Sequence, residues 1–342
     1  MVKRIMTKGT PTLEDVARIA GVSRATVSRV VNGTRNVDPQ LQETVRDAIA
    51  RTGYSPNRAA RSLVTRRAGT VALVISGAGG GSDVFVDPFF GRVTAGVVDF
   101  LRTRGVHPVL MLSDTDQTRA EVVDFLRQGS ADGALLVTTH ATDPLPARLL
   151  EAGAAVVLYA RPGTPMPVSY VDLDHQAGGR LAAARLVEIG RTSVATISGP
   201  LDVLASQERL MGFRDAMARH GFPYVPTVEG GFTAASGEEA MERLLAEHPG
   251  VDGVFAANDL MAQGAVDVLV ARGRRVPEDV AVVGFDDSVP AELCRPPLTT
   301  VRQPVEAMAA KMAELLLLSI DAPDERPKSV IFEPELVIRA SA

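Results

Sequence analysis

Seven short apolar runs recur between residues 71 and 285, and they restrict the fold of most of this 342-residue chain. They are VALVI (71–75), PVLML (108–112), ALLV (134–137), AVVLY (155–159), VATI (194–197), GVFAA (253–257) and VAVVGF (280–285). Amphipathic stretches of helical length separate them. Continuous β-branched runs between helices are typical of parallel strands that are covered on both faces. We therefore expect a doubly wound α/β fold.

The strand-like runs fall into two sets, one before residue 160 and one after residue 190, which predicts two lobes. SYVDLD (169–174) would cross from the first lobe to the second, and LTTVRQP (298–304) would cross back. A helix over 303–320 and final strands around 329–339 complete the lobes. We expect a ligand-binding core over 69–342, whose first lobe takes about 69–168 and 301–328 and whose second takes about 169–300 and 329–342.

The first 67 residues carry a charge opposite in sign to that of the rest. They hold 13 Lys and Arg against 5 Asp and Glu, a net charge of +8, whereas the remainder holds 23 against 36, or −13. A basic block can release counterions from a phosphate backbone, and an acidic remainder would be repelled by it. The two parts therefore face different partners.

Capping residues and apolar spacing predict three short helices in this basic block. Thr12, Ser23 and Asp38 can cap their starts, and Gly21 and Gly53 can end the first and third. The apolar positions that would share one core are Val16, Ala17, Ala20, Val27, Val30, Val31, Leu41, Val45, Ala48 and Ile49. We expect an all-α helix-turn-helix domain over 12–55 after an N-terminal tail of 1–11.

The second helix would leave a polar face outward, at Arg24, Ala25, Ser28, Arg29 and Asn32. Such a face fits a major groove, where arginine reads guanine through two hydrogen bonds. The blocks TLEDVARIAGVSRATVSRVVNG and VRDAIARTGYSPNRAARSL resemble, without a gap, the headpiece of the LacI/GalR (lactose-repressor) family of bacterial transcription factors.

That resemblance implies specific roles on the DNA. It makes Arg24, Ala25 and Arg29 the base readers, and Ser23, Thr26, Ser28 and Asn32 mainly phosphate contacts. The full set of DNA-binding candidates adds Thr12, Tyr54, Asn57, Arg58, Ala60 and Leu63. For Arg24 and Arg29, simple solvation of a helix face is the alternative.

Residues 56–68 form a hinge between the headpiece and the core. Asn57 can cap a helix of about two turns, which is marginal alone in water. In the family, the equivalent segments of two subunits pair in the central minor groove, and a leucine from each bends the DNA. Leu63 is the matching residue, and ordinary packing is its alternative role.

From Val71 to the C-terminus, the chain resembles the effector core of the same family, which has the fold of periplasmic sugar-binding proteins. Ligands in such sheets bind at the carboxyl ends of the strands, between the lobes. The motifs SQERLMGF, AAND and GFDD match Arg209, Asn258 and Asp286 to ligand-binding positions, and Phe232 falls where an aromatic covers a ring. Strand-end positions add Asp87, Phe89 and Arg161.

These residue types suit a polyhydroxylated ligand, because carboxylate, amide and guanidinium groups pair with hydroxyls. Structural roles are the alternatives: Asn258, Asp259 and Asp287 as helix caps, Phe232 in the core, and Arg209 paired with Glu208 or another carboxylate. Three features depart from well-known sugar responders: Ala205 stands where a second hydroxyl is expected, tryptophan is absent, and the loop 77–87 is long and glycine-rich. The effector is therefore a carbohydrate or, alternatively, a nucleobase or a phosphorylated partner protein.

Other classes of protein fit the sequence less well. The loop ISGAGGGSD has Ser82 in place of the third glycine of a dinucleotide fingerprint, and Pro88 interrupts before a helix begins. No Ser-His-Asp order stands out, so we expect no enzyme. A periplasmic solute-binding protein would need a signal sequence, which the start of the chain lacks.

The remaining expectations concern cofactors, location and assembly. The lone Cys294 excludes an internal disulfide, and the five histidines show no metal-ligand spacing, so we expect no structural metal. We also expect no cofactor. No apolar run is long enough to span a membrane, so we expect a cytoplasmic, nucleoid-associated protein. The chain shows no leucine heptads after its last strand, and we expect a homodimer that binds a palindromic operator in double-stranded DNA.

Overall fold

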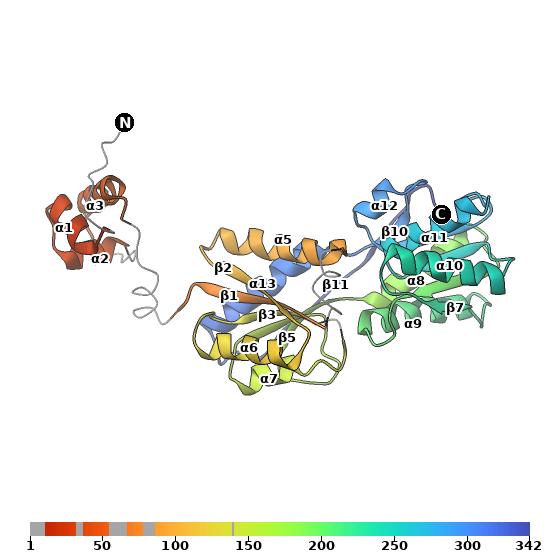
Figure 1. Cartoon of the computed structure of the whole chain (residues 1–342), viewed down its shortest axis with the longest axis horizontal. Helices are drawn as coiled ribbons and strands as arrows, with labels where there is room; N and C mark the ends of the chain where they lie inside the picture. The colour runs from red at the N-terminus through yellow and green to blue at the C-terminus, as the bar shows by residue number, and fades with distance from the viewer. Residues whose placement is uncertain (1–10, 32–36, 55–66, 78–85, 139) are drawn as a thin grey trace. The chain divides into compact units, whose positions relative to one another are not determined.

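The computed structural model describes residues 11–31, 37–54, 67–77, 86–138 and 140–342 (Figure 1). The chain divides into two units, one up to Ala68 and one from Gly69 onward. The predicted hinge contacts Asn57, Arg58, Ala60 and Leu63, and the predicted phosphate contact Asn32, lie outside the described residues.

The first unit contains the three predicted helices, α1 (Leu13–Ala20), α2 (Arg24–Val31) and α3 (Pro39–Thr52). Thr12 and Asp15 form a reciprocal capping box at the start of α1. Gly21 and Gly53 end α1 and α3 in the left-handed conformation, at φ 67° and 68°. Because glycine has no Cβ, it adopts this conformation without strain.

The core of this unit is formed by Val16, Ala17, Val27, Val45 and Ala48. Val30, Val31 and Ile49 pack at its edge, as expected. The prediction that Leu41 belongs to this core is wrong, since 40% of its surface is exposed. Leu41 lies in the first turn of α3, one turn before Val45, and the buried residues of α3 begin only at Val45.

The second unit holds two six-stranded sheets (Figure 1). The first has the order β11-β5-β4-β3-β1-β2 and is parallel throughout. Its strands are β1 (Thr70–Ser76), β2 (His107–Ser113), β3 (Ala134–Thr138), β4 (Val156–Tyr159), β5 (Ser169–Leu173) and β11 (Ser329–Phe332). Its helices are α5 (Pro88–Arg102), α6 (Asp116–Arg127), α7 (Leu145–Glu151) and α13 (Val305–Asp321).

The second sheet has the order β12-β10-β9-β8-β6-β7, and only β12 runs antiparallel to its neighbour. Its strands are β6 (Val194–Ser198), β7 (Thr227–Glu229), β8 (Gly253–Ala256), β9 (Ala281–Asp286), β10 (Thr299–Arg302) and β12 (Glu335–Val337). Its helices are α8 (His175–Glu188), α9 (Leu204–Arg219), α10 (Ala234–Glu247), α11 (Asp259–Ala271) and α12 (Val289–Leu293).

Strand β1 shows why its apolar run is continuous. Val71, Leu73 and Ile75 pack into the cluster that includes residues of α5 and α13, whereas Ala72 and Val74 pack into the cluster with α6 and α7. Alternate side chains of a strand point to opposite faces, so a strand covered on both faces needs apolar residues at every position. The predicted doubly wound α/β fold is confirmed.

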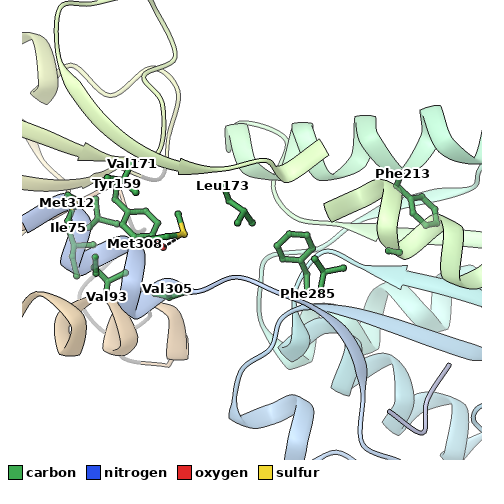
Figure 2. Packing of buried hydrophobic residues seen from close by; sticks show 14 of the residues in the cluster. Ile75, Val93, Tyr159, Val171, Leu173, Phe213, Phe285, Val305, Met308 and Met312 are labelled. Carbon is green, nitrogen blue, oxygen red and sulfur yellow. Dashed lines mark hydrogen bonds between the residues drawn. The ribbon is translucent and has the colours of Figure 1, made fainter. Parts of the chain in front are cut away.

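The chain passes between the lobes three times: after β5, after β10 and between β11 and β12. The predicted lobe boundaries therefore need correction, because 169–173 and 329–332 belong to the first sheet and 299–302 to the second. The reason is strand pairing: β5 hydrogen-bonds to β4, and β11 extends the same sheet beyond β5. One apolar cluster spans both lobes, and Figure 2 shows Leu173 between Tyr159 and Met308 on one side and Phe285 on the other.

Candidate functional site

A cavity of about 380 Å³ lies where the carboxyl ends of strands from both sheets meet. Its lining includes Gly77, Thr138 and Tyr159 from the first lobe, and Asn258 and Asp286 from the second. Small-molecule sites typically occupy about 300 to 1,000 Å³ and lie at this edge of parallel sheets. The cavity is therefore a candidate ligand site.

Six of the seven predicted effector residues line this cavity, and one does not. Those in the lining are Asp87, Phe89, Arg209, Phe232, Asn258 and Asp286. Arg161 is absent from it, because its guanidinium is held by Asp172 (Nε–Oδ2 2.6 Å) and Glu208 (Nη1–Oε1 3.3 Å). The structure therefore does not bring Arg161 to the cavity lining with the other six residues, and Glu208 pairs with Arg161 instead of Arg209.

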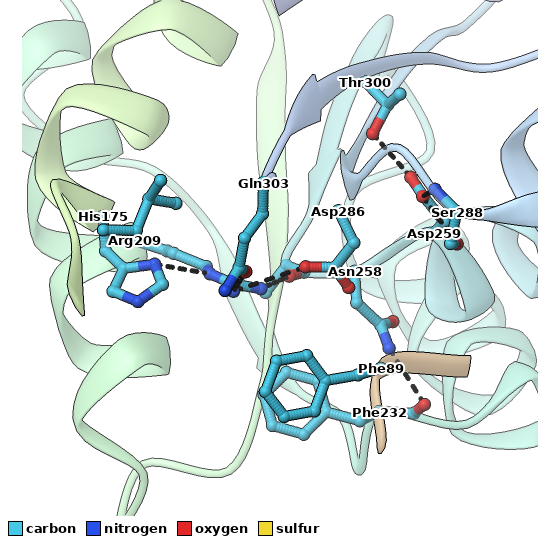
Figure 3. Close-up of polar contacts among 12 residues, drawn as sticks. Phe89, His175, Arg209, Phe232, Asn258, Asp259, Asp286, Ser288, Thr300 and Gln303 are labelled. Atoms are coloured by element: carbon cyan, nitrogen blue, oxygen red, sulfur yellow. Dashed lines mark hydrogen bonds and ion pairs between the residues drawn. The ribbon is translucent and has the colours of Figure 1, made fainter. Parts of the chain in front are cut away.

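Arg209 lines the cavity and makes polar contacts with several neighbouring residues (Figure 3). It lies in the second turn of α9 and is buried. Its Nε donates to Nδ1 of His175 (3.2 Å), its Nη1 to the Ala257 carbonyl (2.6 Å) and its Nη2 to Oε1 of Gln303 (3.1 Å). The guanidinium also stacks 3.7 Å from the ring centroid of Phe285. These contacts hold the guanidinium in a defined position.

Asp286 provides the counter-charge to Arg209. Its Oδ1 lies 3.4 Å from Nη2 of Arg209, and its backbone has φ 103° at the end of β9. Burial raises the pKa of Asp286, although Arg209 acts in the opposite direction. Burial likewise lowers the pKa of Arg209, and Asp286 opposes that shift. A buried pair of this kind holds a carboxylate and a planar donor in fixed geometry, where adjacent hydroxyl groups can bind.

Asn258 links two elements of the second lobe. Its Oδ1 accepts a hydrogen bond from the Met261 amide at the start of α11, and its Nδ2 donates to the Phe232 carbonyl. Phe232 has a left-handed backbone (φ 62°), which is uncommon for an aromatic residue. A Cβ at Gly199 would lie 2.4 Å from the Phe232 ring, so this glycine leaves the space that the ring occupies. Asn258 therefore does cap α11, the alternative role that the sequence indicates, and the same side chain positions Phe232 in the cavity wall.

Aromatic rings also cover the first-lobe side of the cavity. Phe89 packs edge-on against Phe90 (centroids 5.2 Å apart) and Tyr159 (5.3 Å). Asp87 caps α5 by accepting from the Phe89 amide at 2.9 Å, which fixes the first turn that carries these rings. Burial raises the pKa of Asp87.

Two neighbouring aspartates have structural roles. Asp259 is buried and accepts hydrogen bonds from the amide and hydroxyl of Ser288 and from the hydroxyl of Thr300 (Figure 3). Burial raises the pKa of Asp259 to about 6. Asp287 accepts from Arg302 and Arg339. Neither aspartate lines the cavity.

Among the lining residues that sequence reasoning missed, Tyr159, His175 and Gln303 contact one another or Arg209. Gln303 donates through Nε2 to the Tyr159 hydroxyl at 3.0 Å while it accepts from Arg209. His175 must be neutral with its proton on Nε2, because Nδ1 accepts from Arg209; burial holds its pKa well below the usual value. Tyr159 could have been found, since it ends the AVVLY run at a strand terminus.

The outward face of α2 is the candidate nucleic-acid surface. Arg24, Ala25 and Arg29 are exposed, whereas Val27 on the opposite side is fully buried. Arg24 pairs with Glu14 of α1, with 3.1 Å between Nε and Oε1. The three predicted base readers are therefore accessible on one helix.

The other described DNA-contact candidates lie at helix starts or against the helical core. Thr12 and Ser23 accept hydrogen bonds from the amides of Asp15 and Thr26 and remain exposed. Thr26 and Ser28 are partly buried. Tyr54 packs against the core of the first unit, and burial raises its pKa. Hydroxyls at helix N-termini are common phosphate ligands in DNA complexes.

Comparison with known proteins matches both units. Residues 12–57 match the model of bacterial regulatory proteins of the lacI family, and residues 183–342 match a periplasmic binding protein-like domain. The HTH-type transcriptional regulator CelR of Thermobifida fusca is 48% identical over 335 residues, which cover 97% of this chain and 98% of that protein. The chain belongs to the lacI family of bacterial regulatory proteins. The family assignment made from the headpiece sequence is confirmed.

Further relatives match this lacI-family chain along almost its whole length. The ribose operon repressor of Escherichia coli K12 is 32% identical and covers 97% of this chain and 99% of its own length. A solved complex of the transcriptional regulator CelR with cellobiose has a TM-score of 0.77 at 45% identity, covering 97% of this chain and 100% of that one. A lac repressor dimer bound to operator and the anti-inducer ONPF has a TM-score of 0.84 at 25% identity, covering 97% and 99%.

These findings identify the protein as a DNA-binding transcriptional regulator with a helix-turn-helix headpiece and a two-lobed core. The relatives named above are regulators of transcription. Among the described helices, none is long and apolar enough to cross a membrane.

Proposed function

We propose that this regulator is a repressor whose operator affinity is controlled by a small carbohydrate bound in the interlobe cavity. The observation that carries the proposal is the buried Arg209–Asp286 pair in a cavity that is also walled by Phe89 and Phe232. The ion pair and the amide of Asn258 offer donors and acceptors for adjacent hydroxyls. The aromatic faces suit the apolar C–H groups of a sugar ring.

The effector we favour is a glucose disaccharide of the cellobiose type. The solved CelR–cellobiose complex is 45% identical and is covered over its whole length, which supports this choice. A cavity of about 380 Å³ lies at the lower end of the range for small-molecule sites, and it suits a ligand of one or two rings.

On the DNA side, two copies of the chain would read a palindromic operator. The exposed face of α2 supports Arg24, Ala25 and Arg29 as base contacts, and the hydroxyls of Ser23 and Thr12 as phosphate contacts. The solved lac repressor dimer on its operator supports a dimer with two-fold symmetry. The remaining candidates, Ser28, Thr26, Asn32, Tyr54 and the hinge residues including Leu63, belong to the same proposed surface.

Two measurements on the purified full chain test effector binding and operator recognition separately. Titration calorimetry with cellobiose, glucose, ribose and purine bases measures effector binding, and selection from random duplexes followed by gel shift defines the operator. We expect saturable binding of cellobiose and a selected palindrome. Binding of a purine base without any sugar would refute the carbohydrate proposal, and equal affinity for random and selected duplexes would refute operator recognition.

A further inference from the structure

A histidine and an aspartate from opposite lobes meet at the edge of the cavity. His140 follows β3 in the first lobe, and Asp202 lies in the turn between β6 and α9 in the second. Nδ1 of His140 lies 2.8 Å from Oδ2 of Asp202. The Ala141 amide also donates to the Asp202 carbonyl at 3.3 Å, so the lobes touch here at two points.

The segment that carries His140 is anchored within its own lobe. Its carbonyl accepts hydrogen bonds from the Thr138 hydroxyl (3.1 Å) and from the Asp143 amide (3.3 Å). The Asp143 side chain is buried beside Arg119, with 3.5 Å between Nε and Oδ1. The other ring nitrogen of His140, Nε2, faces the Gly77 carbonyl. The ring is therefore held in place before it meets the second lobe.

The second-lobe side is anchored as well. The Leu201 amide, next to Asp202, donates to Oε1 of Glu229 at 3.1 Å, and the Leu201 carbonyl accepts from Nε2 of Gln207 at 2.6 Å. The Asp202 side chain is 65% exposed and that of His140 is 36% exposed, so the contact lies near solvent. His140 and Pro200 both line the cavity, which places the contact at its rim.

We propose that His140 and Asp202 form an interlobe clasp that lengthens the time for which a bound effector stays in the cavity. This inference deepens the proposed function and rests on it for the effector, whereas the clasp itself is a property of the two lobes. A contact that spans the rim must break when the lobes separate to release a ligand. It therefore adds to the barrier for dissociation, and its loss should raise the dissociation rate.

The expected size follows from solvent exposure. Partly exposed pairs contribute little to free energy because water screens them. We therefore expect loss of the clasp to speed effector dissociation by about twofold to fivefold, and not by orders of magnitude.

The test compares His140→Ala, Asp202→Ala and the double variant in the full chain. His220→Ala is the matched control, because His220 is an exposed histidine that ends α9 and lies outside the cavity lining. Stopped-flow dilution gives the cellobiose dissociation rate. Amide hydrogen exchange of peptides spanning 140–143 and 200–203 gives the stability of the contact without sugar.

We expect each single variant to speed exchange in both peptides and to raise the dissociation rate, and the double variant to match either single one. The control should behave as the wild type. Unchanged exchange in both peptides, or rate increases that multiply in the double variant, would overturn the clasp. If the wild type binds no cellobiose, the proposed effector is wrong, and the exchange measurement alone decides whether the clasp exists.

Discussion

Replacing Arg209 by methionine should both destabilise the core and abolish effector binding. The substitution keeps much of the side-chain volume but removes the donors to His175, Ala257 and Gln303 and the counter-charge of Asp286. Removing one partner of a buried pair typically costs about 3 to 5 kcal/mol, since the remaining charge stays buried without compensation. We therefore expect the free energy of unfolding to fall by about 3 to 5 kcal/mol.

The assay is urea unfolding of the full chain, followed by far-ultraviolet circular dichroism because the sequence has no tryptophan. Arg243→Met is the surface control: Arg243 pairs with Glu247 on the exposed face of α10, and its loss should leave the unfolding midpoint unchanged. The pair of changes Arg209→Met and Asp286→Leu should recover much of the lost stability, because no unpaired charge is left in the core.

Sugar binding separates the two roles of Arg209. The double variant should be stable yet unable to bind cellobiose, whereas Arg161→Met, which removes a guanidinium outside the cavity lining, should keep sugar affinity within about threefold, a change of less than 1 kcal/mol. If Arg209→Met unfolded at the wild-type urea concentration and still bound sugar, the assignment of Arg209 to the centre of the site would be refuted.

Three other substitutions probe the DNA-reading helix, the buried histidine and the packing of α8 against α9. Arg29→Ala should weaken binding to the selected operator by about 1 to 3 kcal/mol and relax one base position in gel shifts, and equal loss on every duplex would make Arg29 a phosphate contact. His175 is neutral in the folded protein and its pKa is depressed by burial, so the unfolded state takes up a proton first as the pH falls. The contribution of His175 to the free energy of unfolding should therefore be complete above about pH 6.5, and that free energy should fall by up to about 1.4 kcal/mol per pH unit below it. In urea titrations, His175→Gln should reduce this dependence on pH. The same dependence in the variant and the wild type would contradict the assignment of a depressed pKa to His175. Gly179→Ala should cost about 1 to 3 kcal/mol, because its Cβ would lie 2.3 Å from the Arg209 carbonyl, whereas Gly250→Ala, with open space around it, should melt close to the wild type.

Much of the fold could be predicted from the sequence because the signals are local. The continuous runs locate seven strands, and the caps at Thr12 and Asp38 locate helix starts, since each depends on neighbouring residues. β7 (Thr227–Glu229) was missed because three residues carry too little periodicity to be recognised. The lobe boundaries were misplaced because the pairing of β5 and β11 is a long-range property.

Fewer residues of the site could be predicted from the sequence, because the site forms where strand ends from two sheets converge. Motif matches found Arg209, Asn258 and Asp286, which lie together in the cavity lining. Arg161 also follows a strand, but its guanidinium pairs with Asp172 and Glu208 and it is not part of the cavity lining. Nothing in the local sequence around His175 or Gln303 indicates that both would contact the same guanidinium.

Occupation of the interlobe cavity should change the affinity of the separate DNA-reading unit for its operator. This coupling is tested most directly by measuring cellobiose affinity with and without saturating operator, and operator affinity with and without saturating cellobiose, at one fixed salt concentration. We expect both affinities to change by the same factor, roughly 5-fold to 150-fold, because linkage is reciprocal. Tight binding of both ligands with neither affinity altered by the other would contradict it.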